Sequence, residues 1–170
     1  MKSIHFILVL LFISACSSGI SDTEEQAIYW KITSAINNQD SSNLSESDYD
    51  HISDYISDGR TRWIALYPKL NKEPFLGMTS FQEGLTISMA YALPDNPSEV
   101  LKFVDENNVN SICGMPFIEP AGDEINKYYL KARTAIMAVN PGIPWKKRCL
   151  SIMESIMKNG PVFAYEQNRR

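Results

Sequence analysis

Apolar side chains recur every three or four positions along most of the chain, which is the spacing of one face of an α-helix. The clearest series cover residues 21–38, 49–70, 79–93, 125–139 and 145–156. No segment alternates apolar and polar residues as a half-buried strand does. The pattern predicts an all-α domain, built as a helical bundle or a short α-hairpin solenoid of about five to seven helices.

Several helix starts and breaks can be assigned from local residue types. Ser80 and Glu83 have capping-box spacing, which predicts a helix start after Ser80. Residues 96–99 (Asn-Pro-Ser-Glu) combine an N-cap residue, a proline at the first helical position and a glutamate at the third. Gly59 interrupts the series over residues 49–70, which therefore predicts one long helix or two shorter ones, because glycine costs about 1 kcal/mol inside a helix.

The first residues have the layout of a secretory signal peptide. Lys2 precedes an apolar run over residues 4–13, which is about half the length of ~20 residues that a membrane-spanning helix needs. The small residues Ser14 and Ala15 then lead directly into Cys16.

The sequence Ile13-Ser14-Ala15-Cys16 resembles the lipobox of bacterial lipoproteins. The resemblance implies that residues 1–15 are removed and that Cys16 carries fatty acids such as palmitate, which anchor the protein stably in a membrane. The residue after Cys16 is Ser17 and not aspartate, which resembles the signal that sorts bacterial lipoproteins to the outer membrane. We expect a lipid-anchored protein of the bacterial outer membrane facing the periplasm; the alternative is an ordinary signal peptide cleaved after Ala15.

The expected mature chain consists of a lipidated tether, residues 16–22, and a single helical domain, residues 23–170. The chain has three cysteines, and acylation of Cys16 leaves Cys113 and Cys149 as a pair. In an oxidising periplasm we expect these two to form a disulfide. It would close a loop of about 37 residues, for which the chain-entropy estimate is roughly 4 kcal/mol. Two buried free thiols or a catalytic cysteine are the alternatives.

Few side chains are available for catalysis. His51 is the histidine left after removal of the signal peptide, and it lies beside Asp50 and Asp54 on the polar side of a helix, where we expect it to be solvated. The chain lacks the ligand spacing of zinc or EF-hand sites and the glycine motifs of phosphate-binding loops. We therefore expect no catalytic residue, no metal and no cofactor.

Two glutamates could still act as a pair of catalytic carboxylates. Glu83 and Glu119 each lie near a turn with an aromatic residue close by, Phe81 and Phe117 respectively. Two such carboxyl groups facing each other would allow a peptidoglycan-acting hydrolase. The capping box gives Glu83 a structural role instead, and a charge such as Glu119 is ordinary in a loop.

Charge is unevenly distributed along the chain. Residues 22–58 contain nine acidic residues against one basic one, and residues 127–170 contain nine basic residues against two acidic ones. The mature chain is net negative, and in this compartment we expect no nucleic-acid partner. The basic segment around Trp145, Lys146 and Lys147 is expected to pair with the domain's own acidic half; the alternative is a contact with anionic lipid, lipopolysaccharide or an acidic protein.

The general plan, a small exported helical domain with one disulfide, resembles that of periplasmic immunity proteins that block cell-wall-degrading toxins. The resemblance implies a non-catalytic protein-binding module; the alternatives are the hydrolase and an envelope assembly or structural lipoprotein. We expect the partner to contact an exposed loop on a rigid scaffold. The candidate residues are Met115, Pro116, Phe117, Glu119, Trp145, Lys146 and Lys147, although Pro116 and Phe117 would equally serve to cover the core.

Mass spectrometry of the protein extracted from membranes tests the expected processing. The lipobox predicts a mature chain that begins at Cys16 and carries acyl chains on that residue. A chain that retains residues 1–15, or an unmodified sulfur at position 16, would contradict both the location and the reason for expecting a disulfide.

Overall fold

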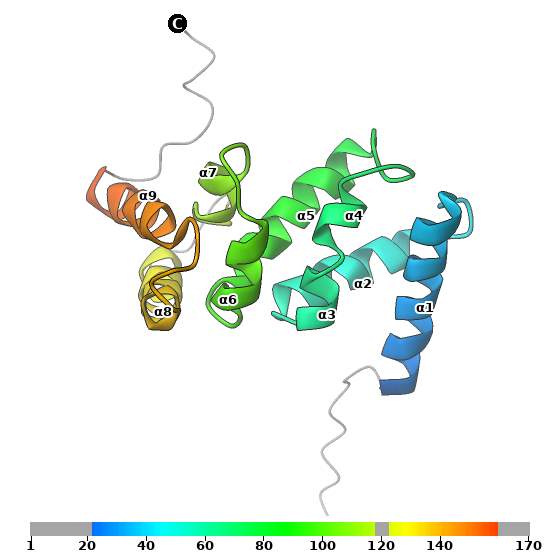
Figure 1. Ribbon diagram of the computed structural model, residues 1–170, viewed down its shortest axis with the longest axis horizontal. Coiled ribbons are helices and arrows are strands. Elements are labelled where there is room, and N and C mark those ends of the chain that lie inside the picture. The colour runs from blue at the N-terminus through cyan, green and yellow to red at the C-terminus, as the bar shows by residue number, and fades with distance from the viewer. Residues whose placement is uncertain (1–21, 118–122, 160–170) are drawn as a thin grey trace, which may run out of the picture.

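A computed structural model of the chain describes residues 22–117 and 123–159, and all regular secondary structure in those residues is helical (Figure 1). The helices are α1 (Asp22–Asn38), α2 (Glu46–Ser57), α3 (Thr61–Ile64), α4 (Tyr67–Leu70), α5 (Thr79–Ala92), α6 (Pro97–Val100), η1 (the 3₁₀ turn Leu101–Phe103), α7 (Val109–Ile112), α8 (Glu124–Ala138) and α9 (Lys146–Asn159). The all-α prediction is confirmed. The expected lipidation site, Cys16, and the candidate Glu119 lie outside the described residues.

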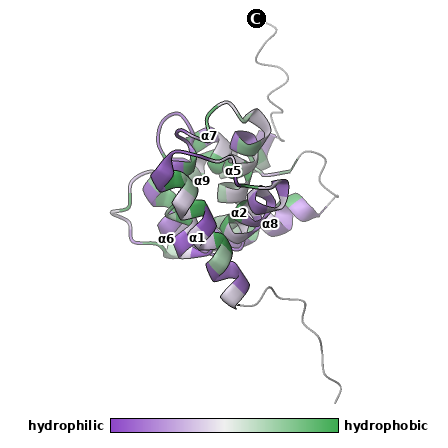
Figure 2. Cartoon of the chain, turned by 90° about the vertical axis from the view of Figure 1, so that its right-hand side faces the viewer, coloured by the Kyte–Doolittle hydropathy of each residue, from purple (hydrophilic) through white to green (hydrophobic). Residues whose placement is uncertain are grey.

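The helices follow one another along the long axis of the molecule. α1 lies at one end, α5 is central, and α8 and α9 lie together at the other end (Figure 1). α5 packs against α2 on one side and α7 on the other, and α8 packs against α9. Viewed from the α1 end, the helices carry both hydrophilic and hydrophobic segments (Figure 2). The arrangement is that of a short stack of helices.

The predicted apolar stripes are the faces that the helices bury. Ile28 and Ile32 of α1 and Ala132 and Ile136 of α8 lie in one core, and Met153 of α9 belongs to it as well. The largest side chains of this core are almost fully buried, and they include Tyr55 of α2, Trp63 of α3, Phe75, and Leu85 and Met89 of α5. Burial of side chains of this size contributes about 1.5–3 kcal/mol each, which stabilises the helices against one another.

The series over residues 49–70 forms three helices, where we predicted one or two. Gly59 has a φ of 73°, which ends α2, and a side chain there would meet the Cβ of Asp95 at 3.1 Å. The chain then makes the single turns α3 and α4. Glycine is therefore needed at position 59 both for the turn and for the close approach of the segment before α6.

One predicted helix start is confirmed and the other is wrong. The Asn96 side chain accepts a hydrogen bond from the Glu99 N–H at 3.4 Å and caps α6. The capping box at Ser80 does not form, because α5 begins one residue earlier, at Thr79, without a side-chain cap. A capping box exists instead at Ser45 and Asp48, at the start of α2.

A buried carboxylate fastens α1 to α3. Glu25 of α1 is 9 % exposed, and its carboxylate accepts hydrogen bonds from the Trp63 indole at 2.7 Å and from Arg62 Nε at 3.0 Å. Arg60 donates to the other carboxylate oxygen. These bonds leave the charge of Glu25 compensated, which a buried carboxylate requires.

The two arginines are also held by aromatic rings. The Arg60 guanidinium lies 4.4 Å from the ring centroid of Tyr55, and the Arg62 guanidinium lies 4.8 Å from that of Tyr29. Such cation–π contacts contribute about 0.5–1 kcal/mol each when partly exposed. They orient the guanidinium groups toward Glu25.

The pKa of Glu25 follows from this environment. Burial alone raises the pKa, but the hydrogen bonds from Trp63 and Arg62 and the charge of Arg60 outweigh burial and hold the pKa below its ordinary value of 4.5. Because the pKa of Glu25 is lowered in the folded state, its carboxylate stabilises the fold fully at pH values above the pKa that it has in the unfolded chain. That stabilisation is lost as the pH falls through the folded value.

We expect Glu25→Gln to lower the free energy of unfolding by about 2 kcal/mol at neutral pH, because hydrogen bonds to a charged group are lost. The difference between variant and wild type should shrink as the pH falls below 4.5. Urea denaturation at a series of pH values measures it, and the exposed Glu106→Gln serves as a control. A difference independent of pH would contradict this account of Glu25.

Candidate functional site

A groove of about 510 Å³ runs between α5 and the segment that follows α7. It is lined by Asn71, Thr79, Gln82, Glu83, Thr86, Ile87, Ser111, Met115, Pro116 and Phe117. We call this hollow the α5 groove. The α5 residues among them lie on one face of the helix, because positions three and four apart share a side. Leu85 and Met89, farther round the helix, are buried in the core.

The structure therefore brings together three of the predicted partner-binding residues. Met115 and Phe117 are half-buried and Pro116 is buried, and all three line the groove. Glu83, predicted as one of two paired carboxylates, is exposed and lines the same groove.

Phe117 is held between two helices. Its ring makes edge-to-face contacts with Tyr91 of α5 at 5.8 Å and with Tyr128 of α8 at 5.5 Å between centroids. Tyr128 in turn donates a hydrogen bond of 2.7 Å from its hydroxyl to the Ala90 carbonyl. Burial raises the pKa of Tyr128, so the hydroxyl stays a donor at physiological pH. The Phe117 ring is thus fixed where the α5 groove meets a second hollow of about 390 Å³.

Apolar surface is exposed along the groove. Ile87 and Tyr91 lie one helical turn apart on α5, and each is 38 % exposed. With Met115 and Phe117 they form what we call the apolar strip. Ile87 and Tyr91 were not predicted as site residues. The signal that could have found them is that both lie off the stripe of Phe81, Leu85, Ser88 and Ala92, which α5 buries.

A disulfide fixes the segment that forms one wall of the groove. Cys113 and Cys149 are bonded, as predicted, and neither has exposed surface. The bond joins Cys113, at the end of α7, to Cys149 in the first turn of α9. Cys113 is two residues before Met115. Gly114 permits the chain to pass close to α7, because a Cβ there would lie 2.7 Å from the Asn110 carbonyl oxygen.

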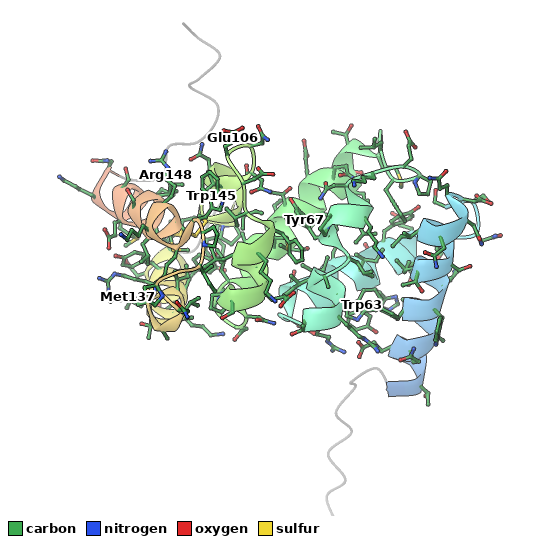
Figure 3. All side chains as sticks on the ribbon, viewed as in Figure 1. Trp63, Tyr67, Glu106, Met137, Trp145 and Arg148 are labelled. Atoms are coloured by element: carbon green, nitrogen blue, oxygen red, sulfur yellow. A yellow bond between two sulfur atoms is a disulfide. The ribbon has the colours of Figure 1, made fainter. Side chains whose placement is uncertain are left out.

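The remaining predicted partner-binding residues lie elsewhere. Trp145 (Figure 3) directly precedes α9, Lys146 and Lys147 are the first two residues of that helix, and none of the three lines the α5 groove. Trp145 is half-buried against the core, with a φ of 65°. Lys146 donates hydrogen bonds to the carbonyls of Met137, at 2.7 Å, and Val139, which satisfies the end of α8. Lys147 is exposed.

The expected pairing of the basic segment with the acidic half is wrong for the described residues. The acidic helices and α9 lie at opposite ends of the molecule, so their side chains are too far apart (Figure 1). Each end forms its own ion pairs: Glu25 with Arg60 and Arg62 and Asp48 with Lys31 at one end, and Lys131 with Asp95 and Arg133 with Glu154 toward the other.

His51 is less solvated than we predicted. Its side chain is half-buried, and its ring stacks on Tyr55 with centroids 6.0 Å apart. Its Nδ1 is buried and has no hydrogen-bond partner in the part of the chain that the structure describes. Within residues 22–117 and 123–159 there is also no group of three or more His, Cys, Asp or Glu side chains placed to hold a metal ion.

No family model matches the chain, and no curated protein or solved structure was found to be similar to it. Among the helices that the structure describes, none combines the length and the apolar character needed to cross a membrane.

We expect the double variant Cys113→Ala/Cys149→Ala to be less stable by roughly 2–4 kcal/mol, because the cross-link restricts the unfolded chain over a separation of 36 residues. Guanidinium denaturation measures the loss. Reduction of the wild type should reproduce it and should not change the double variant further. Equal stability of all forms would show that the bond contributes nothing to the scaffold.

Proposed function

We propose that this protein is a lipid-anchored periplasmic module that binds another protein through the α5 groove and has no catalytic activity of its own. Its partner is a cell-wall-targeting toxin, which it blocks as an immunity protein. The lipobox-like sequence ending at Cys16 supports export and anchoring. The small helical domain with one disulfide supports the comparison with immunity proteins.

The observation that carries the proposal is the exposed apolar strip on a rigid frame. Large apolar side chains gathered at the surface and bordered by polar ones are typical of protein-binding sites. Phe117 is fixed by two aromatic contacts, and the disulfide holds the segment before it. A surface already ordered before binding loses less conformational entropy on binding, which favours affinity.

The hydrolase is the second candidate, because Glu83 lies in a groove of suitable size. Such an enzyme needs two carboxyl groups about 5–10 Å apart. Glu83→Gln separates the two functions. Release of soluble fragments from isolated peptidoglycan measures the difference: a hydrolase releases fragments and loses this activity in the variant, whereas a binding module releases none in either form.

Site-specific photo-crosslinking tests the binding proposal directly. A photoreactive phenylalanine analogue at Ile87 should give a discrete crosslinked product in intact cells, because that side chain lies in the proposed contact. The same analogue at Trp30, which is 67 % exposed on α1, is the matched control and should give none. The proteins encoded by the neighbouring genes are the first partners to look for in the product.

Ile87→Asp should lower recovery of the partner at least tenfold, since an unpaired carboxylate would then be buried at the contact. Leu130→Asp, a change at an exposed apolar residue of α8, should not affect recovery. Crosslinking that is absent at position 87, or equal at positions 87 and 30, would contradict the proposed site.

A further inference from the structure

We infer that the partner inserts an arginine beside an aliphatic or aromatic side chain into the α5 groove, where the arginine pairs with Glu83. This inference rests on the proposed function and names the chemistry that the groove recognises. It follows from the hydrogen-bonding capacity and the charge of the lining.

Most of the side-chain amide donors of the lining are already used within the fold. Gln82 donates through Nε2 to the carbonyls of Leu70, at 2.9 Å, and Phe75, at 3.2 Å. Asn71 donates through Nδ2 to the Tyr67 carbonyl at 3.1 Å. These bonds use both N–H donors of Gln82 and one of the two of Asn71, so the two amides offer two acceptor oxygens against one further donor.

The hydroxyl groups of the lining do not change its excess of hydrogen-bond acceptors over donors. Thr86 donates to the Gln82 carbonyl at 3.2 Å, and the hydroxyls of Thr79 and Ser111 can either donate or accept. The side chains of the lining therefore offer mainly acceptors. An occupant that fits them must bring donors.

Charge adds to the same preference. Among the lining residues that the structure describes, Glu83 is the charged one, and it is exposed. Arginine supplies five N–H donors in a planar fork, so it can contact a carboxylate and a neighbouring amide oxygen at once. An acidic occupant would meet like charge and few donors.

The spacing of the lining sets the position of the apolar side chain. Glu83 and Ile87 are four residues apart on α5 and so lie next to each other on one face. An apolar side chain of the partner that packs on Ile87 and Phe117 therefore places a neighbouring arginine within reach of Glu83. The apolar contact provides affinity and the arginine provides selectivity.

Selection from a phage-displayed library of random peptides tests the inference on the detergent-solubilised full-length lipoprotein. Wild type should enrich peptides in which arginine adjoins an aliphatic or aromatic residue. Glu83→Arg should enrich acidic peptides instead. Glu83→Gln should raise the dissociation constant of the best wild-type peptide about tenfold, which corresponds to a loss of roughly 1.4 kcal/mol of binding free energy. Glu106→Gln, at an exposed site in the loop before α7 (Figure 3), should change nothing.

The outcomes separate this inference from the proposed function. Peptides that depend on Ile87 but bind Glu83→Gln as tightly as wild type would overturn the arginine inference and leave the groove as the binding surface. Peptides that bind equally to wild type and Ile87→Asp would count against the groove itself. Enriched peptides without a basic residue, or no enrichment at all, would also overturn the inference.

Discussion

Cys113 and Cys149 are joined where the protein has no contact with solvent, and their bond determines the geometry of the C-terminal half. It ties the end of α7 to the first turn of α9, so that α8 and its connections form a closed loop. Met115 and Phe117 follow the first of these cysteines directly. The wall of the α5 groove is therefore part of a covalently closed unit, while the facing wall, α5, belongs to the central stack.

The two walls are kept in register by weaker contacts. Tyr128 bonds to the Ala90 carbonyl, and Phe117 packs between Tyr128 and Tyr91. Each such contact contributes on the order of 1 kcal/mol. Together with the disulfide they hold the apolar strip in place at the surface.

The opposite end of the molecule is held by polar groups. Glu25, Arg60, Arg62 and the indole of Trp63 form a compensated buried cluster between α1 and α3. α1 follows the expected tether, residues 16–22. α1, the first described helix, and the α5 groove lie in different parts of the stack (Figure 1).

Local spacing was sufficient to predict some features and not others. The stripes of α1, α8 and α9 and the cap at Asn96 depend on residues within one or two helical turns, and these predictions are confirmed. The cysteine pairing was predicted from the expected compartment. The bond between Glu25 and Trp63, by contrast, joins residues 38 positions apart, and no local pattern encodes it.

The candidate site was predicted in part for the same reason. The proline-rich segment after Cys113 marked Met115 and Phe117, but their neighbours Ile87 and Tyr91 are brought there by the packing of α5 against α7. The sequence suggested that the basic segment pairs with the acidic half of the domain. Lys146 is instead engaged by main-chain carbonyls at the end of α8, which only the three-dimensional arrangement reveals.

Hydroxyl-radical footprinting of the lipoprotein with its co-purified partner, and after the partner has been removed, tests the central claim most directly. The account predicts that the partner lowers side-chain oxidation at Tyr91, Met115 and Phe117 and leaves Trp30 and Met137 unchanged. Protection at Trp30 or at Trp145, with the α5 groove oxidised to the same extent in both states, would contradict it.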